Sequence, residues 1–157
     1  MNELLSEING VAIEHVLEGD AATLEEIRKI ICKWIRFESN KGMPAAAAAA
    51  AAAAVSEAIK KFIAAVEAAK RVANAKTLAD AIENENKAEF YELQRRLMVD
   101  KVLKGAEKSR YDALLDELQK LDADVSQEQR IYQSELDAIW ARVPSEWKPA
   151  GGQLGHK

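Results

Sequence analysis

The side chains that most often act as nucleophiles or metal ligands are scarce in this sequence of 157 residues. It contains one cysteine, Cys32, and two histidines, His15 and His156. Zinc and di-iron sites need several His, Cys or carboxylate ligands at fixed spacing, and the sequence has no cysteine pair, no His-Glu-x-x-His and no Glu-x-x-His motif. Reactive thiols need exposure and a lowered pKa, whereas Cys32 lies between Ile31 and Lys33 in a strongly apolar segment, so we interpret it as a small core residue. We expect no metal and no cofactor.

The acidic and glycine-rich patterns add little further chemistry. Glu85, Glu89 and Glu92 share a helical face, but a solvated charged face is far more common than a metal site. The glycines within residues 151–155 have no predicted strand before them and no helix after them, which excludes a nucleotide-binding fingerprint by its context. No serine occupies a nucleophile elbow. The sequence therefore predicts a protein that is not an enzyme.

Charge is divided unevenly along the chain, although the formal net charge is only −4. Residues 1–27 hold seven acids and no Lys or Arg, whereas residues 28–76 hold ten bases and three acids. Lys29, Lys33 and Arg36 share one helical face, so this face could bind nucleic-acid phosphates or an acidic partner. Alternatively, the acidic helices on either side pack against the basic middle and neutralise it. The lack of a base-reading motif favours neutralisation.

Two tryptophans near the C-terminus are candidate partner anchors, because tryptophan is enriched at the centres of interfaces. Trp140 ends the last predicted helix, and Trp147 follows in a segment with proline and glycine. In one interpretation Trp147 docks into a groove of a partner. In the other it folds back on Trp140 and covers the core of the chain itself. The sequence leaves both open.

The elements that must carry these residues are helices. The chain has 29 alanines but only 7 glycines and 3 prolines, a composition that favours long helices over strands. With 31% charged and 6% aromatic residues, the core must consist mainly of thin aliphatic seams. We therefore predict an all-α, elongated helical bundle with a long, coiled-coil-like antiparallel helical hairpin.

The predicted organisation is a single domain with four segments and five helices. Predicted capping boxes at Thr23 and Ser109, a cap at Thr77, and breaks at Gly19 and Gly105 set the helix limits. The segments are a two-helix N-terminal segment (1–43), a long Ala-rich helix (44–76), the antiparallel hairpin (77–143) and a flexible C-terminal tail (144–157).

Apolar residues recur at steps of three and four in the long helices, which is typical of coiled-coil seams. We expect these seams to mediate self-association. The predicted seam residues are Val55, Ile59, Phe62, Val66, Leu118, Leu121, Val125, Tyr132 and Leu136.

Ten consecutive alanines, Ala45–Ala54, precede the first seam. They form good helix but supply little apolar volume. Either the block is native and allows close approach of helices, or it stands in for other side chains. The intact mass, compared with 17.3 kDa, separates the two.

These observations together predict a non-enzymatic structural or assembly protein that oligomerises through helical seams and docks onto a larger partner. One alternative is a nucleic-acid-associated factor, such as a DNA-packaging or phage particle-assembly subunit. Another is an adaptor or inhibitor that acts through its Trp-containing tail. The longest uncharged apolar run, 45–55, is too short to span a bilayer. A lone cysteine favours a reducing, cytoplasmic compartment or an intracellularly assembled particle.

Overall fold

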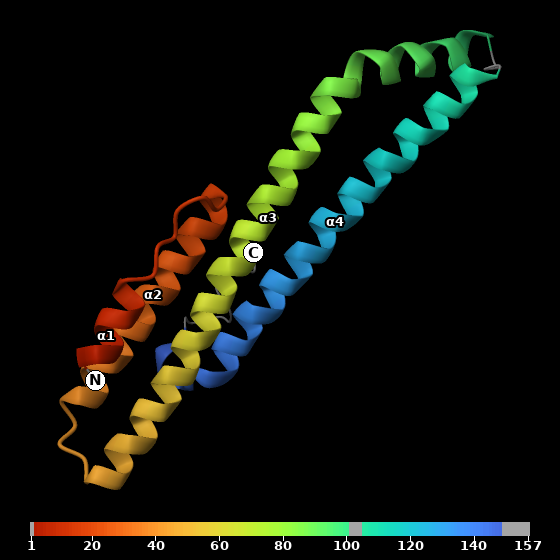
Figure 1. Ribbon diagram of the computed structural model, residues 1–157. Coiled ribbons are helices and arrows are strands. Elements are labelled where there is room, and N and C mark those ends of the chain that lie inside the picture. The colour runs from red at the N-terminus through yellow and green to blue at the C-terminus, as the bar shows by residue number, and fades with distance from the viewer. Residues whose placement is uncertain (1, 101–104, 149–157) are drawn as a thin grey trace.

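The fold is all-α, as predicted. The computed structural model describes residues 2–100 and 105–148, with side chains up to residue 96 in the first stretch. α3 and α4 form a long antiparallel hairpin, and α1 and α2 lie along the half of α3 that is farther from the hairpin turn (Figure 1). None of the described helices is both long enough and apolar enough to cross a membrane. The elements are α1 (Asn2–Asn9), α2 (Glu18–Ser39), α3 (Ala45–Asp100), α4 (Ala106–Arg142) and a short 3-10 turn, η1 (Ser145–Trp147).

α3 is a single helix of 56 residues, so the predicted break between residues 76 and 77 is wrong. Thr77 does not cap a helix: its Oγ1 donates a hydrogen bond to the carbonyl of Ala73, 2.9 Å away and one turn earlier. This is the usual way for threonine to satisfy its hydroxyl inside a helix. Neither glycine nor proline occurs between residues 45 and 100, and nothing else forces the helix to stop. At 1.5 Å per residue the helix is roughly 84 Å long.

The N-terminal segment also differs from its prediction. α1 ends at Asn9, well before the predicted break at Gly19, because the chain turns at Gly10 and again at His15, which has a positive φ of 65°. α2 begins at Glu18, so Thr23 is no cap either: its Oγ1 donates to the carbonyl of Gly19 at 3.1 Å. The guanidinium of Arg28 donates to the carbonyl of Val11 and fastens this loop to α2.

The core lies where α1, α2, α3 and the end of α4 meet. Its largest fully buried side chains include Phe62 of α3 and Trp140 of α4. Four buried alanines of α3 lie among them, and such small side chains let neighbouring helices approach closely. We call this part the proximal half: residues 45–76 of α3 with α1, α2 and residues 126–142 of α4. The core alanines of α3 are Ala58, Ala65, Ala68 and Ala69.

The distal half is the remainder of the hairpin, residues 77–100 and 106–125, and it contains only two helices. Gly105 precedes α4 with a φ of 55°, a conformation that favours glycine, and it confirms the predicted chain reversal. Phe90 of α3 stacks on Tyr111 of α4, with ring centroids 5.5 Å apart and planes 6° from parallel. Nearby, Arg96 pairs with Glu107 at 2.8 Å. α4 begins at Ala106, ahead of the predicted cap at Ser109.

Candidate interaction surface

The side chains that could do chemistry are dispersed or buried. Over residues 2–100 and 105–148, no group of three or more His, Cys, Asp and Glu side chains could hold a metal ion. Cys32 is 6% exposed, and its Sγ lies 3.4 Å from Oδ1 of Asn9, to which it donates. Burial raises the pKa of the Cys32 thiol despite the opposing charge of Arg36, which makes it a poor nucleophile. His15 is exposed, and His156 lies outside the described residues.

The acidic face of α3 forms ion pairs. Nε of Arg110 lies 2.8 Å from Glu89 across the hairpin, and Arg95 lies 2.8 Å from Glu92 on the same helix. These hydrogen bonds hold the pKa of both carboxyls below the ordinary value for glutamate. Glu85 is also exposed. The face is a solvated ion-pairing surface.

The predicted basic face lies exposed on α2. Lys29 approaches Glu26 at 3.5 Å, with both side chains more than half exposed. Lys33 and Arg36 are also exposed, and neither forms an ion pair with any residue that the structure describes. This face therefore retains two uncompensated positive charges.

Other bases of the middle segment have acidic partners. Lys61 and Arg71 of α3 lie 4.0 and 3.0 Å from carboxylates of α4, those of Glu135 and Glu128. These contacts are of the kind that the neutralisation interpretation requires. They join α3 to α4, whereas α2 keeps its outward charges.

The two candidate tryptophans have different surroundings. Trp140 is 2% exposed and belongs to the core, where it cannot reach a partner. Trp147 of η1 is partly buried against that core, and its ring meets Phe37 of α2 edge-on, with centroids 5.4 Å apart. Trp147 therefore folds back on the chain, and its ring contact is with α2. Its indole N–H has no hydrogen-bond acceptor within the described residues.

Phe37 lies at the exposed side of this ring contact. It is 41% exposed, and Nζ of Lys41 lies 4.8 Å from its ring centroid, within cation–π range. The sequence could have indicated this exposure. Leu24, Ile27 and Ile31 form a buried stripe at three- and four-residue steps, and Phe37 falls outside it.

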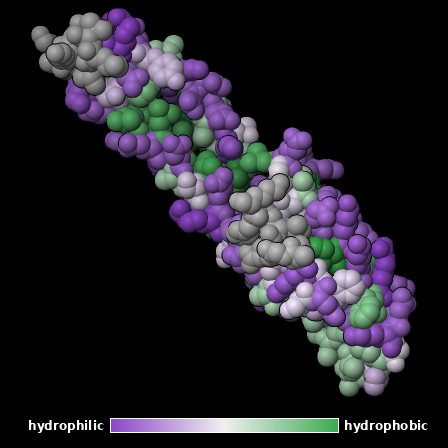
Figure 2. All heavy atoms as spheres, turned by 180° about the vertical axis from the view of Figure 1, so that it is seen from behind, coloured by the Kyte–Doolittle hydropathy of each residue, from purple (hydrophilic) through white to green (hydrophobic). Residues whose placement is uncertain are grey.

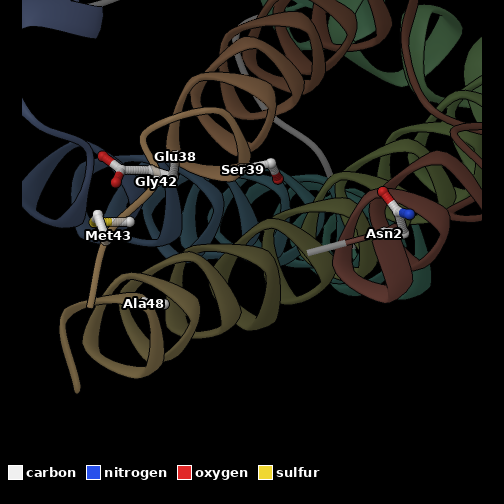
Figure 3. Close-up of a pocket in the computed structure, with 6 residues that line it drawn as sticks. All are labelled: Asn2, Glu38, Ser39, Gly42, Met43 and Ala48. Carbon is white, nitrogen blue, oxygen red and sulfur yellow. The ribbon is translucent and has the colours of Figure 1, made fainter. Parts of the chain in front are cut away.

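An open pocket of about 380 Å³ lies at the same end of α2. Glu38 and Met43 lie together on one side of it, and Asn2 of α1 lies on the other (Figure 3). Ala48 of the polyalanine block also lines the pocket, which places the end of α2 at the level of residue 48 of α3. The pocket carries no cluster of catalytic groups.

A second cleft, of about 420 Å³, lies at the opposite end of α2, against α4. Tyr132 is 7% exposed, and its hydroxyl has no hydrogen-bond partner among the described residues. Burial raises the pKa of Tyr132, and the carboxyl of Asp20 acts in the same direction. Burial also raises the pKa of Asp20, against the effect of Lys76. Lys76 is close enough to affect the pKa of Asp20, so the start of α2 lies toward the distal half, whereas its end lies at the level of Ala48.

The predicted self-association seam separates into two groups. Most of its members are buried within the chain, where they form the proximal core. Leu118, Leu121 and Val125 are only partly buried although they lie along the hairpin. The buried members are Val55, Ile59, Phe62, Val66, Tyr132 and Leu136.

No family model, no curated protein and no solved structure matches this chain. Any functional conclusion therefore depends on the geometry of the chain itself.

Proposed function

We propose that this chain is a non-enzymatic structural or assembly protein that self-associates through its distal hairpin and docks onto a larger partner. The observation that carries the proposal is the incomplete burial of the distal seam, which we define as Leu118, Leu121 and Val125. In the proximal half, seam residues of α3 such as Ile59 and Phe62 are 0% exposed because α2 and α4 both cover them. In the distal half, α3 and α4 have only each other.

Two helices cannot enclose an apolar stripe on all sides. Leu93 and Leu114 are buried at 7% and 1% exposure, but Leu118, Leu121 and Val125 remain partly open to solvent. Apolar patches appear between polar borders along the face seen in Figure 2. Such seams gain burial by packing against another helical pair, and this is the physical reason that we expect self-association.

The mass in solution tests this proposal. Multi-angle light scattering at micromolar concentration should give a mass well above 17.3 kDa. Replacing Leu118 and Leu121 by Gln should shift the protein toward the monomer, because apolar burial at the interface is lost. Ala113→Gln is the matched control, since Ala113 lies exposed on the same helix. A strictly monomeric wild-type protein would contradict the proposal.

A nucleic-acid-associated factor is the second candidate. It is supported by Lys33 and Arg36, which are exposed and have no acidic partner in the described part of the chain. Binding of duplex DNA at low salt that is lost in Lys33→Ala/Arg36→Ala would support this candidate. The absence of binding at low salt would eliminate it.

A reducing, cytoplasmic setting, or the interior of an intracellularly assembled particle, belongs to the same proposal. It is supported by the single cysteine, which is buried as a free thiol.

A further inference from the structure

Two features that are far apart in the sequence form one surface at the C-terminal end of α2. Lys33 and Arg36 supply uncompensated charge, and Phe37 and Lys41 follow on the same helix and just beyond it. Trp147 of η1 adds a second aromatic ring, in edge contact with Phe37. We call these five residues the basic–aromatic patch. Lys41 pairs with Glu38 at 3.5 Å, but the exposed ring of Phe37 and the unpaired cations Lys33 and Arg36 together suit an acidic protein surface that also offers apolar side chains.

The distal half carries a surface of the opposite sign. Within residues 80–85 and 116–124 there are seven acidic side chains and one base, Lys120, and all of them are exposed. None of the seven forms an ion pair with a described residue, although Glu117, after Glu89, helps to raise the pKa of Arg110. These carboxylates lie at one level of the hairpin but on several faces of its two helices, and together we call them the acidic belt: Asp80, Glu83, Glu85, Asp116, Glu117, Asp122 and Asp124.

The register of the hairpin brings both parts of the belt to one level. Phe90 stacks on Tyr111, and Arg71 pairs with Glu128, so residues near 82 of α3 lie opposite residues near 118 of α4. The partly exposed side chains of Leu118 and Leu121 lie within this level. The belt thus combines negative charge with accessible apolar area.

One molecule cannot bring its own patch and belt together. The patch lies near the level of Ala48, and the belt begins 32 residues later on the same continuous helix. At 1.5 Å per residue the belt is roughly 50 Å from the end of α2 and roughly 40 Å from the level of Lys33, which is about five to six Debye lengths at physiological salt. Contact between them requires a second molecule.

We propose that the basic–aromatic patch binds the acidic belt of a second copy of this chain, with the two rods side by side and antiparallel. This inference rests on the proposed self-association and specifies its contact. In a two-fold dimer the same pairing occurs twice, and the assembly closes. Each contact places Lys33 and Arg36 against belt carboxylates and sets Phe37 beside the partly exposed leucines.

Nucleic acid is a less suitable occupant of the patch. Proteins that bind duplex DNA through its backbone commonly neutralise about 6–10 phosphates, whereas this patch has two cations without acidic neighbours. The formal net charge of −4 also opposes a polyanion at long range.

Charge reversal with rescue tests the pairing. Sedimentation equilibrium of the full chain should give a dimer whose Kd weakens as salt is raised from roughly 50 to roughly 500 mM, because this shortens the Debye length about threefold. Lys33→Glu/Arg36→Glu should weaken the Kd by at least about tenfold, because like charges then face each other. Asp80→Lys/Glu83→Lys, at two belt residues one turn apart on the same face of α3, should do the same, and combining all four changes in one chain should restore association.

The controls separate this pairing from a fold defect. All four substituted side chains are exposed, so helical content should stay unchanged, and the melting temperature should stay unchanged at a concentration low enough to keep every variant monomeric. Lys60→Glu is the matched control, since Lys60 is also exposed but lies outside the patch and pairs with Glu57. It should leave the Kd unchanged.

The outcomes distinguish the two proposals. A monomeric wild-type chain overturns the proposed function. A dimer that is indifferent to salt and to Lys33→Glu/Arg36→Glu overturns only the pairing and leaves seam association in place. If the same variant abolishes binding to duplex DNA while the dimer persists, the patch is a nucleic-acid surface and the pairing is wrong.

Discussion

The proximal and distal halves share α3 and α4 but differ in what surrounds these helices. In the proximal half α2 covers α3. The core-facing side chains of α3 between Val55 and Val72 are only 0–1% exposed. In the distal half Leu78 and Tyr91 are 56% and 50% exposed. One continuous helix thus changes from a core helix to half of an isolated pair. A coiled-coil pattern specifies that a stripe is buried, and the number of neighbours decides how completely.

The largest expected difference between the halves is in the cost of core truncation. Phe62→Ala should lower the free energy of unfolding by about 3–5 kcal/mol, because it leaves a cavity in a fully packed region. Leu118→Ala should cost about 1 kcal/mol, since that side chain is already partly solvated. Urea denaturation followed by circular dichroism measures both, at a concentration low enough to keep the protein monomeric. Equal costs would contradict the comparison.

The hairpin turn gives a smaller effect with an internal control. Gly105 has a φ of 55°, and a Cβ at this position would meet no atom within 4 Å. Gly105→Ala should therefore destabilise the chain only through its backbone conformation, by about 1–2 kcal/mol.

Gly19 is the matched control for Gly105. A Cβ at Gly19 would also lie in open space, but this residue belongs to the first turn of α2 and has no positive φ. Gly19→Ala should raise stability by about 0.5–1 kcal/mol, because alanine is the better helix former. Thermal melts of the two variants should shift in opposite directions. If both melting temperatures shifted in the same direction, backbone conformation would not be what determines the effect of the added Cβ.

The ring contact between α2 and η1 gives the next smaller effect. Phe37→Ala and Trp147→Ala, measured singly and together, should show a coupling free energy of about 0.5–1.5 kcal/mol, which is typical of an edge-to-face pair. Chemical denaturation of the four proteins measures this coupling. Strict additivity would mean that Trp147 packs on the core without help from Phe37.

The sequence predicts most of the hairpin and little of the candidate surface. Alanine content, the predicted seam from Leu118 to Leu136 and the break at Gly105 suffice for an antiparallel pair. Thr77 gave a wrong helix limit, because a hydroxyl that can cap a helix can equally bond to the preceding turn, as it does with Ala73. Without a nearby glycine or proline, local residue types do not distinguish a threonine that begins a helix from one in its interior.

The basic–aromatic patch could be predicted only in part. Lys33 and Arg36 follow from helical periodicity, and both are exposed as a surface stripe requires. The meeting of Trp147 with Phe37 joins residues more than one hundred positions apart, and no periodicity encodes it. That contact depends on where α4 ends relative to α2, which is set by packing along the whole proximal half.

The smallest effect concerns ionisation inside the proximal core. Burial raises the pKa of Cys32 above its ordinary value of 9.0, and the hydrogen bond to Asn9 also favours the protonated thiol. In the unfolded chain the thiol ionises as the pH passes 9.0, while the folded chain still holds its proton. Stability that depends on Cys32 is therefore complete below pH 9.0 and is lost as the pH rises above it.

Cys32→Ala isolates this contribution from other groups that titrate in alkali. At about pH 7 the variant should be less stable than the wild type because a buried side chain is truncated. At about one pH unit above 9.0 the difference should shrink by less than about 1.4 kcal/mol, the limit for a folded thiol that does not ionise at all. Urea denaturation of both proteins at the two pH values measures the change. A difference that grows with pH would mean that Arg36 and Arg28 stabilise a buried thiolate, and that the proximal core is wetter than its packing indicates.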